Sequence, residues 1–184
     1  MAAASNRQAG WAAAQRLRED GRIDAAADAV IALWHTAQAD RDETMAALGF
    51  LKECGAQDRA LTIARAARQR WPGDARIAAE AGEIALALGL FDEASSALRE
   101  AVDLDPRQGA AWLRLAHCRR FAEDDADVQR LRRTWSDAGL DETTRTCVGF
   151  ALGKALDDLG DHAQAARVLT DANARARKAS GWHI

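Results

Sequence analysis

The sequence predicts an all-α protein built as an α-solenoid, a stack of helix-turn-helix units. Alanine, which has the highest helix propensity, supplies 45 of the 184 residues. Tyrosine is absent and only two prolines occur, so residues that favour strands or interrupt helices are scarce. Glycine, alanine and proline also share one spacing along the chain, which an ordinary alanine-rich helical bundle would not require.

The common spacing is that of a helix-turn-helix repeat. Gly21, Gly55 and Gly89 are evenly spaced, and an aspartate stands at the third position after each of them. A glycine ends a helix in the left-handed conformation at low steric cost, and aspartate suits the start of the next helix. Pro72 and Pro106 are separated by the same interval as the glycines and lie where the second helix of a unit must stop.

The spacing divides residues 7–179 into one domain of five units. Their predicted boundaries are 7–40, 41–74, 75–108, 109–145 and 146–179. The fourth unit is longer because its turn, FAEDDAD at 121–127, carries an insertion. In the fifth unit, Gly160 takes the place that Gly21 has in the first. Residues 1–6 are expected to form a flexible N-terminal tail, and residues 180–184 a C-terminal tail.

Small side chains explain how the two helices of a unit approach each other. Unit positions 8, 20 and 27 are mostly alanine or glycine, which allow close contact, while larger residues at positions 7, 11 and 24 fill the space between units. In chain order the residues at positions 8, 20 and 27 are Ala14, Ala26, Leu33; Leu48, Ala60, Ala67; Gly82, Ala94, Ala101; Ala116, Leu131, Ala138; and Gly153, Ala165, Ala172.

These units resemble the tetratricopeptide repeat, which has the same length, about 34 residues. Residues 75–108 match its pattern best, with Ala78, Ala81, Gly82, Ala85, Ala94, Leu98, Ala101 and Pro106 on its eight signature positions. The resemblance implies a right-handed superhelix of about five repeats. It also implies that the first helices of the repeats line a concave groove, which binds a peptide or helix of a partner protein.

The resemblance places repeat positions 5, 9 and 12 in that groove. The chain has large apolar residues along the middle and mixed charges along one side, a row suited to anchoring a partner. The residues expected to bind it are Trp11, Gln15, Arg18, Met45, Lys52, Glu83, Leu113, His117, Arg120, Phe150 and Lys154. The alternative is that Trp11 and Phe150 are partly covered by neighbouring turns.

The charge balance and the cysteine content indicate which classes of partner the protein is expected to bind and in which compartment it is expected to reside. With 25 Lys and Arg against 28 Asp and Glu, no basic field is expected to gather nucleic acid or an anionic membrane. No secretion signal or membrane-spanning window is visible. Three irregularly spaced cysteines do not form a disulfide framework, which favours a reducing, cytoplasmic setting.

Residues that could perform catalysis do not converge. The phrase GFALGKA at 149–155 is one residue short of a phosphate loop and is expected inside a helix. The four histidines are scattered without metal-ligand spacing. His117, Cys118 and Cys147 would form a thiol and imidazole cluster only if two helices bring them together. We therefore expect no catalytic residue, cofactor or metal. The alternative, a small free-standing enzyme, would require a converging set of acid, base, nucleophile or metal ligands.

The last unit has a second, more specific resemblance. FALGKALDDLGDHAQAARVLTDANARARKA, at 150–179, is similar to the repeat that precedes the catalytic domain of bacterial tetratricopeptide-repeat sulfotransferases. His162 departs from that family, which usually has an aromatic residue there. The sequence therefore leaves two functions open: a non-catalytic interaction scaffold, and the N-terminal recognition domain of a larger sulfotransferase-like enzyme whose catalytic part is absent from this chain.

The end of the array is expected to promote self-association. Repeat arrays usually finish with a capping helix that has a polar outer face, and none is visible after residue 179. Four leucines of the last unit are therefore expected to be exposed unless something packs on them: Leu152, Leu156, Leu159 and Leu169. We expect them to be covered by Trp182 and Ile184, by another chain or by a further domain.

Overall fold

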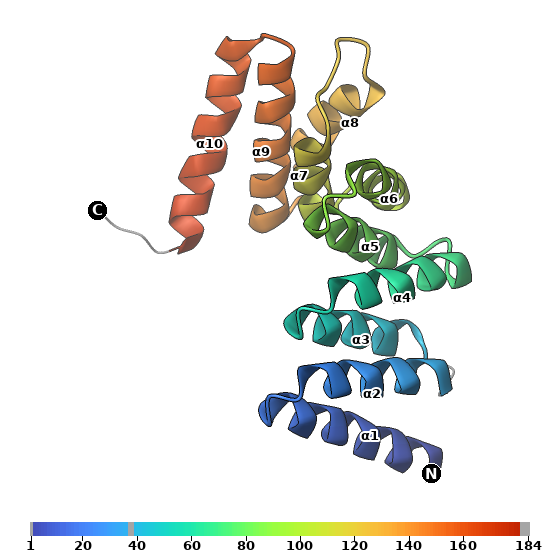
Figure 1. The fold of residues 1–184 in the computed structure, drawn as a ribbon. Coiled ribbons are helices and arrows are strands. Elements are labelled where there is room, and N and C mark those ends of the chain that lie inside the picture. Colours follow the sequence, from blue (N-terminus) through green and yellow to red (C-terminus); the bar gives the residue numbers. More distant parts are fainter. Residues whose placement is uncertain (1, 37–38, 181–184) are drawn as a thin grey trace. The chain divides into compact units, whose positions relative to one another are not determined.

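The computed structural model describes residues 2–36 and 39–180, and this part of the chain forms ten α-helices and no strand (Figure 1). The prediction of an all-α fold is therefore confirmed. The helices are, in chain order, α1 (Ala2–Glu19), α2 (Ile23–Thr36), α3 (Arg41–Glu53), α4 (Gln57–Arg70), α5 (Ala75–Ala87), α6 (Phe91–Leu104), α7 (Gly109–Cys118), α8 (Ala126–Trp135), α9 (Glu142–Asp158) and α10 (His162–Ser180).

The helices belong to two compact units, Met1–Pro72 with α1 to α4 and Gly73–Ile184 with α5 to α10. In the first unit, α1 packs on α2, α2 on α3 and α3 on α4. In the second unit, α5 pairs with α6 and α9 pairs with α10, while α7 packs on both α6 and α9. The prediction that residues 7–179 form one continuous domain stays a prediction.

The glycine turns occur where the repeat spacing predicts them. Gly21, Gly55, Gly89 and Gly160 have φ values between 71° and 77°, a left-handed conformation that costs other residues energy. At Gly89 the glycine N–H donates to the Leu86 carbonyl at 3.0 Å, and the next N–H donates to the Ala85 carbonyl. These bonds satisfy the last carbonyls of the first helix before the chain reverses.

Small side chains permit the close helix contacts that the sequence predicts. A Cβ atom added to Gly82 on α5 would lie 2.5 Å from Cγ of Leu98 on α6. The same addition at Gly153 on α9 would lie 2.5 Å from Cγ of Leu169 on α10. Since Cβ atoms do not approach other carbons this closely, glycine is required at both positions for the observed packing.

The two ends of the described chain are helical. Helix α1 begins at Ala2, so residues 2–6 are helical, and the flexibility expected of them stays a prediction. Three consecutive alanines, which favour helix, begin this segment. At the other end, α10 continues to Ser180. Trp182 and Ile184, which are expected to cover the end of the array, lie outside the described residues.

Helix α9 also begins earlier than predicted. It starts at Glu142, one helical turn before the expected start of the fifth unit at residue 146. The Asp141 carboxylate accepts a hydrogen bond from the Thr144 N–H at 2.9 Å and so caps the helix. Residues 142–145 therefore belong to α9, before the predicted boundary of the fifth unit.

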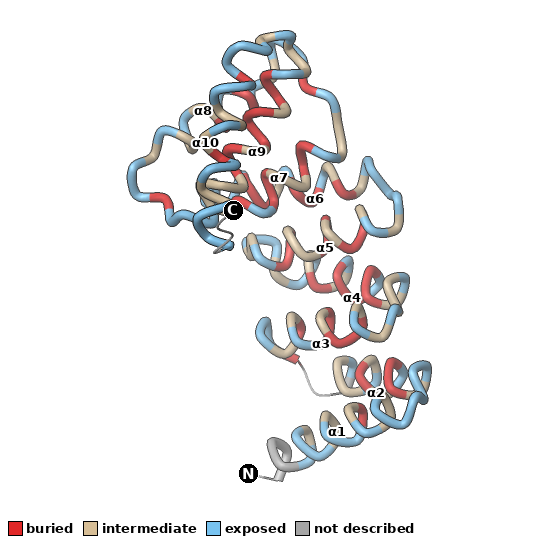
Figure 2. Tube along the Cα trace, turned by 90° about the vertical axis from the view of Figure 1, so that its left-hand side faces the viewer, coloured by how far each residue is buried: buried red, intermediate tan, exposed pale blue. Residues whose placement is uncertain are grey.

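The leucines of the last unit are better covered than the sequence suggests. Leu152 and Leu156 are 3% and 0% exposed, because α9 is flanked by α7, α8 and α10. Most of the middle of α9 is buried (Figure 2). Leu159 and Leu169 are half-buried. The expectation that all four need cover from outside is wrong for Leu152 and Leu156, which the protein's own helices enclose.

Candidate functional site

The first helices of the N-terminal unit carry an aromatic contact. The rings of Trp11 on α1 and Phe50 on α3 meet edge to face, with centroids 6.0 Å apart and an angle of 74°. The Arg18 guanidinium lies 5.0 Å from the centre of the Phe50 ring. Trp11 is half-buried and Phe50 is 8% exposed. This contact joins two predicted binding residues, Trp11 and Arg18, to one that the sequence analysis missed.

Charged residues of the same unit pair across successive repeats. Arg18 forms an ion pair with Glu53, and Arg7 forms one with Glu43, so α1 and α3 are joined at two points. The Gln15 amide donates to the Glu19 carboxylate at 3.0 Å on the same helix. The polar residues predicted to contact a partner from α1 therefore already have intramolecular partners. Met45 and Lys52 are half-buried on α3.

In the C-terminal unit, α7 and α9 cross very closely. A Cβ atom added to Gly109 would lie 2.8 Å from the Thr144 carbonyl oxygen, so the two helix starts nearly touch. Leu113 follows this crossing on α7, and Phe150 follows it on α9; both side chains are half-buried. The structure therefore places the two large apolar residues predicted for this part of the groove on adjacent helices.

Two predicted binding charges of this unit hold helices together. Glu83 on α5 forms an ion pair with Arg114 on α7. Lys154 on α9 forms an ion pair with Asp158, one turn further along. The Lys154 amine also donates to the Arg119 carbonyl at 3.2 Å, after the end of α7. Arg114 was not predicted, because a pair between repeats depends on the angle between the helices, whereas Lys154 and Asp158 are four residues apart on one helix.

Arg120 and His117, unlike Glu83 and Lys154, are exposed. The Arg120 side chain is 81% exposed, and its nearest carboxylate oxygen, on Asp158, is 3.9 Å from Nε. Arg120 donates no hydrogen bond within the described part of the chain. His117 is exposed one turn beyond Leu113. These two residues therefore remain accessible at the end of α7.

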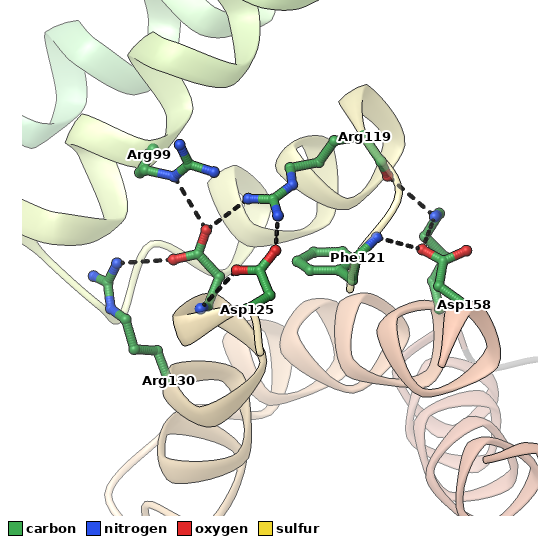
Figure 3. Close-up of polar contacts among 8 residues, drawn as sticks. Arg99, Arg119, Phe121, Asp125, Arg130 and Asp158 are labelled. Carbon is green, nitrogen blue, oxygen red and sulfur yellow. Dashed lines mark hydrogen bonds and ion pairs between the residues drawn. The ribbon is translucent and has the colours of Figure 1, made fainter. Parts of the chain in front are cut away.

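The inserted connection between α7 and α8 is anchored by a cluster of charges (Figure 3). Asp127 accepts hydrogen bonds from Arg99 at 3.1 Å, from Arg119 at 3.0 Å and from Arg130 at 3.2 Å. The Asp127 side chain is only 6% exposed. Arg119 also pairs with Asp125. A buried carboxylate needs such partners, because removing it from water is otherwise costly.

A buried aromatic ring anchors the other part of the connection. Phe121 is 3% exposed and its N–H donates to the Asp158 carboxylate at 3.1 Å. The Arg119 guanidinium lies 4.9 Å from the centre of its ring, and the Lys154 amine 5.8 Å. The sequence indicated an insertion here but no role for it. A signal for such a role was present in the sequence, because Phe121 is a single aromatic residue in an otherwise polar turn.

The thiol and imidazole cluster is not supported by the geometry. No hydrogen bond joins His117 to Cys118 or Cys147 among the described residues. Burial raises the pKa of both thiols, with Arg114 lowering and Asp141 raising that of Cys147 more weakly. A raised pKa disfavours the reactive thiolate. In the described ranges no group of three or more His, Cys, Asp and Glu residues could hold a metal ion.

No helix within residues 2–36 and 39–180 is long and apolar enough to cross a membrane.

The comparisons support the repeat assignment at one place in the sequence and the fold over most of the chain. The family model of the tetratricopeptide repeat matches residues 75–108, the block in which the signature positions are most complete. No curated protein matches the sequence. The sulfotransferase resemblance of residues 150–179 gains no support from any comparison and stays a prediction.

Solved structures of similar fold span nearly the whole chain. A crystal structure of the MamA protein is 13% identical, with 97% of this chain and 96% of that chain covered and a TM-score of 0.65. The tetratricopeptide-like repeats of a putative kinesin light chain from Podosopora anserina are 16% identical, with 97% and 98% covered and a TM-score of 0.63. MamA from Desulfovibrio magneticus RS-1 is 16% identical, with 94% and 96% covered and a TM-score of 0.59. Likeness at this identity shows the fold alone.

Proposed function

We propose that this chain, whose fold is that of tetratricopeptide-repeat solenoids, is a non-catalytic scaffold that binds a segment of a partner protein. The C-terminal unit offers the best surface, which we call the α7–α9 surface: Leu113, His117 and Arg120 from α7 and its end, and Phe150 from α9. The observation that carries the proposal is that half-buried Leu113 and Phe150 lie on two closely crossing helices.

Apolar side chains in such a position suit an anchoring role. Half-buried residues on rigid helices lose little conformational entropy on binding, and contact with a partner removes their remaining apolar surface from water. Glu83 and Lys154 contribute by holding helices in place, since both are already paired. Trp11, Gln15, Arg18, Met45 and Lys52 form the corresponding candidate surface of the N-terminal unit.

The test uses random twelve-residue peptides selected against the full chain. The affinity of the enriched peptides is then measured by fluorescence anisotropy for the wild type and for Leu113→Ala, Phe150→Ala, Trp11→Ala and Met45→Ala. We expect Leu113→Ala or Phe150→Ala to weaken binding about tenfold or more, as for central anchors. Unchanged affinity in all four variants, each folded by circular dichroism, would place the binding site elsewhere.

The sulfotransferase alternative has a separate test. It predicts that the native product is tens of kilodaltons larger than 19.9 kDa and transfers a sulfonate group. The intact mass of the protein from its source cells decides this. A mass equal to that of the present chain favours the free scaffold.

Self-association through the last repeat also remains a proposal. Light scattering at high concentration tests it, and a monodisperse monomer would count against it.

A further inference from the structure

The connection after α7 is extended at its first residue. Arg119 has φ −150° and ψ 164°. In an extended backbone successive side chains point to opposite sides. Arg119 and Phe121 share one side, because the guanidinium of the first lies over the ring of the second. Arg120, between them, must therefore point the other way, which agrees with its 81% exposed side chain.

This orientation is fixed from both sides of Arg120. The Arg119 guanidinium is held by Asp125 and Asp127, and the Arg119 carbonyl accepts a hydrogen bond from Lys154. The Phe121 ring is buried and its N–H is bonded to Asp158. Figure 3 shows Arg119 turned toward Asp125 and the N–H of Phe121 toward Asp158. A one-residue rotation that buried Arg120 would break all of these contacts.

The carboxylate closest to Arg120 is engaged by other groups. Asp158 is paired with Lys154 and accepts the Phe121 N–H, and its oxygen is 3.9 Å from Nε of Arg120. Arg120 therefore keeps most of its five N–H donors for an acceptor that does not belong to the described part of the chain. A guanidinium of this kind binds a carboxylate through two parallel hydrogen bonds.

We propose that the inserted connection presents Arg120 to a carboxylate side chain of the partner, so that the α7–α9 surface selects an extended segment with an apolar residue and a Glu or Asp close by. This rests on the proposed function. Asp158, beside Arg120, lies eight residues beyond Phe150 on α9, a rise of about 12 Å. An extended chain advances about 3.4 Å per residue. The acidic residue therefore stands about four positions from the apolar anchor.

Three synthetic fluorescent peptides test this selectivity. The first has one Phe and one Glu four positions apart in a Gly, Ser and Gln background. The second has Gln in place of Glu, and the third has Glu directly after Phe. Anisotropy titrations of the full chain should give an affinity about tenfold higher for the first than for either of the others. Equal affinities, or no binding of any peptide below about 1 mM, would overturn the proposal.

The variants separate this selectivity from binding itself. Arg120→Gln should abolish the preference for the Glu peptide and leave the affinity for the Gln peptide unchanged. Phe150→Ala should weaken all three peptides alike, and its failure to do so counts against the proposed function. The matched control is Arg107→Gln, an arginine of the same unit that is 62% exposed and paired with Asp137. A preference that survives Arg120→Gln, or is lost equally in Arg107→Gln, contradicts the proposal.

The role of the anchors is tested by a double-mutant cycle. The quantity compared is the affinity for the Glu peptide divided by the affinity for the Gln peptide. Asp127→Asn should lower this ratio toward the value measured for the Arg120→Gln variant, because Arg119 is no longer held inward. In the Arg120→Gln background the same change should have no further effect on this ratio. A merely structural defect would lower both affinities and leave their ratio unchanged. Additive effects of the two substitutions on the ratio would show that the connection does not position Arg120.

Discussion

The third and fourth repeats use different interactions to join their two helices. Between α5 and α6, Gly82 lets Leu98 approach closely, and a short turn at Gly89 reverses the chain. Helix α8 instead packs on α9, and the ends of the longer connection are held by Asp127 and Phe121. The third repeat reverses through a short turn between closely packed helices, whereas the longer connection of the fourth is held by a buried ring and a shared carboxylate.

The difference shows how a repeat tolerates an insertion. A longer turn removes the tight reversal that brings two helices face to face, so the extra residues need anchors of their own. Here the anchors are a buried ring and a carboxylate shared by three guanidinium groups. We expect such an arrangement to favour this conformation, because moving Asp127 away from the arginines would leave a buried charge without partners.

The largest expected effect is in the tightly packed repeat. Leu98→Ala removes a side chain that is fully buried against α5 and leaves a cavity, at a cost of about 2 to 5 kcal/mol of unfolding free energy. Urea unfolding followed by circular dichroism measures it. Leu90→Ala, at the start of α6 where the side chain is 41% exposed, is the control and should cost much less. Equal costs would mean that packing does not dominate this repeat.

The stability of the fourth repeat should depend on the carboxylate of Asp127. Asp127→Ala leaves Arg99, Arg119 and Arg130 without their shared acceptor and should lower the unfolding free energy by about 2 kcal/mol, since the arginines are partly exposed. Asp124→Ala, at an exposed position of the same connection, should have an effect below about 0.5 kcal/mol. If the two variants unfold at the same urea concentration, the anchoring role of Asp127 is wrong.

The turn of the third repeat should require glycine because of its backbone conformation and not because of close packing. Gly89 has φ 73° and nothing within 4 Å of an added Cβ, so Gly89→Ala should cost about 1 kcal/mol through backbone strain. Gly73→Ala also meets no atom, and its φ is not in the left-handed region, so this variant should be as stable as the wild type or slightly more stable. Thermal unfolding compares them, and a stabilised Gly89→Ala would refute the strain argument.

The smallest effect concerns the acid stability of the fourth repeat. Burial raises the pKa of Asp158, but hydrogen bonds from Lys154 and the Phe121 N–H, with the charges of Lys154 and Arg120, lower it below its usual value. A depressed folded pKa stabilises the protein above the unfolded value of about 3.9, and this stabilisation is lost as pH falls through the folded pKa. The difference in melting temperature between wild type and Asp158→Asn should therefore be constant from pH 7 to 5 and shrink below pH 4. A difference that persists at pH 2 contradicts this.

Local features of the fold could be predicted because they depend on few neighbouring residues. The turns at Gly21, Gly55, Gly89 and Gly160 follow from a conformation that glycine adopts readily. The contact between Gly82 and Leu98 follows from side-chain size at fixed repeat positions. The start of α9 differs from the prediction: the helix begins at Glu142 because Asp141 caps it, and the regular repeat spacing gives no indication of this cap.

The candidate site was predictable only in part. Leu113 and Phe150 lie half-buried on adjacent helices, and their role in a partner-binding groove stays a prediction. Burial at the end of the array was not predictable from the repeat positions. Leu152 and Leu156 are enclosed because α9 has neighbours on several sides, and the sequence alone does not show how helices of the longer fourth repeat are placed.

The helical repeat and its glycine turns follow from the amino-acid sequence, because they depend on interactions within one turn or one hairpin. Which of the predicted binding side chains are accessible depends instead on how the helices pack. Arg18 pairs with Glu53 across 35 residues, and Lys154 reaches the Arg119 carbonyl across the same separation, whereas Arg120 remains exposed. Such pairings depend on the angle and distance between helices, and these emerge only when the helices pack.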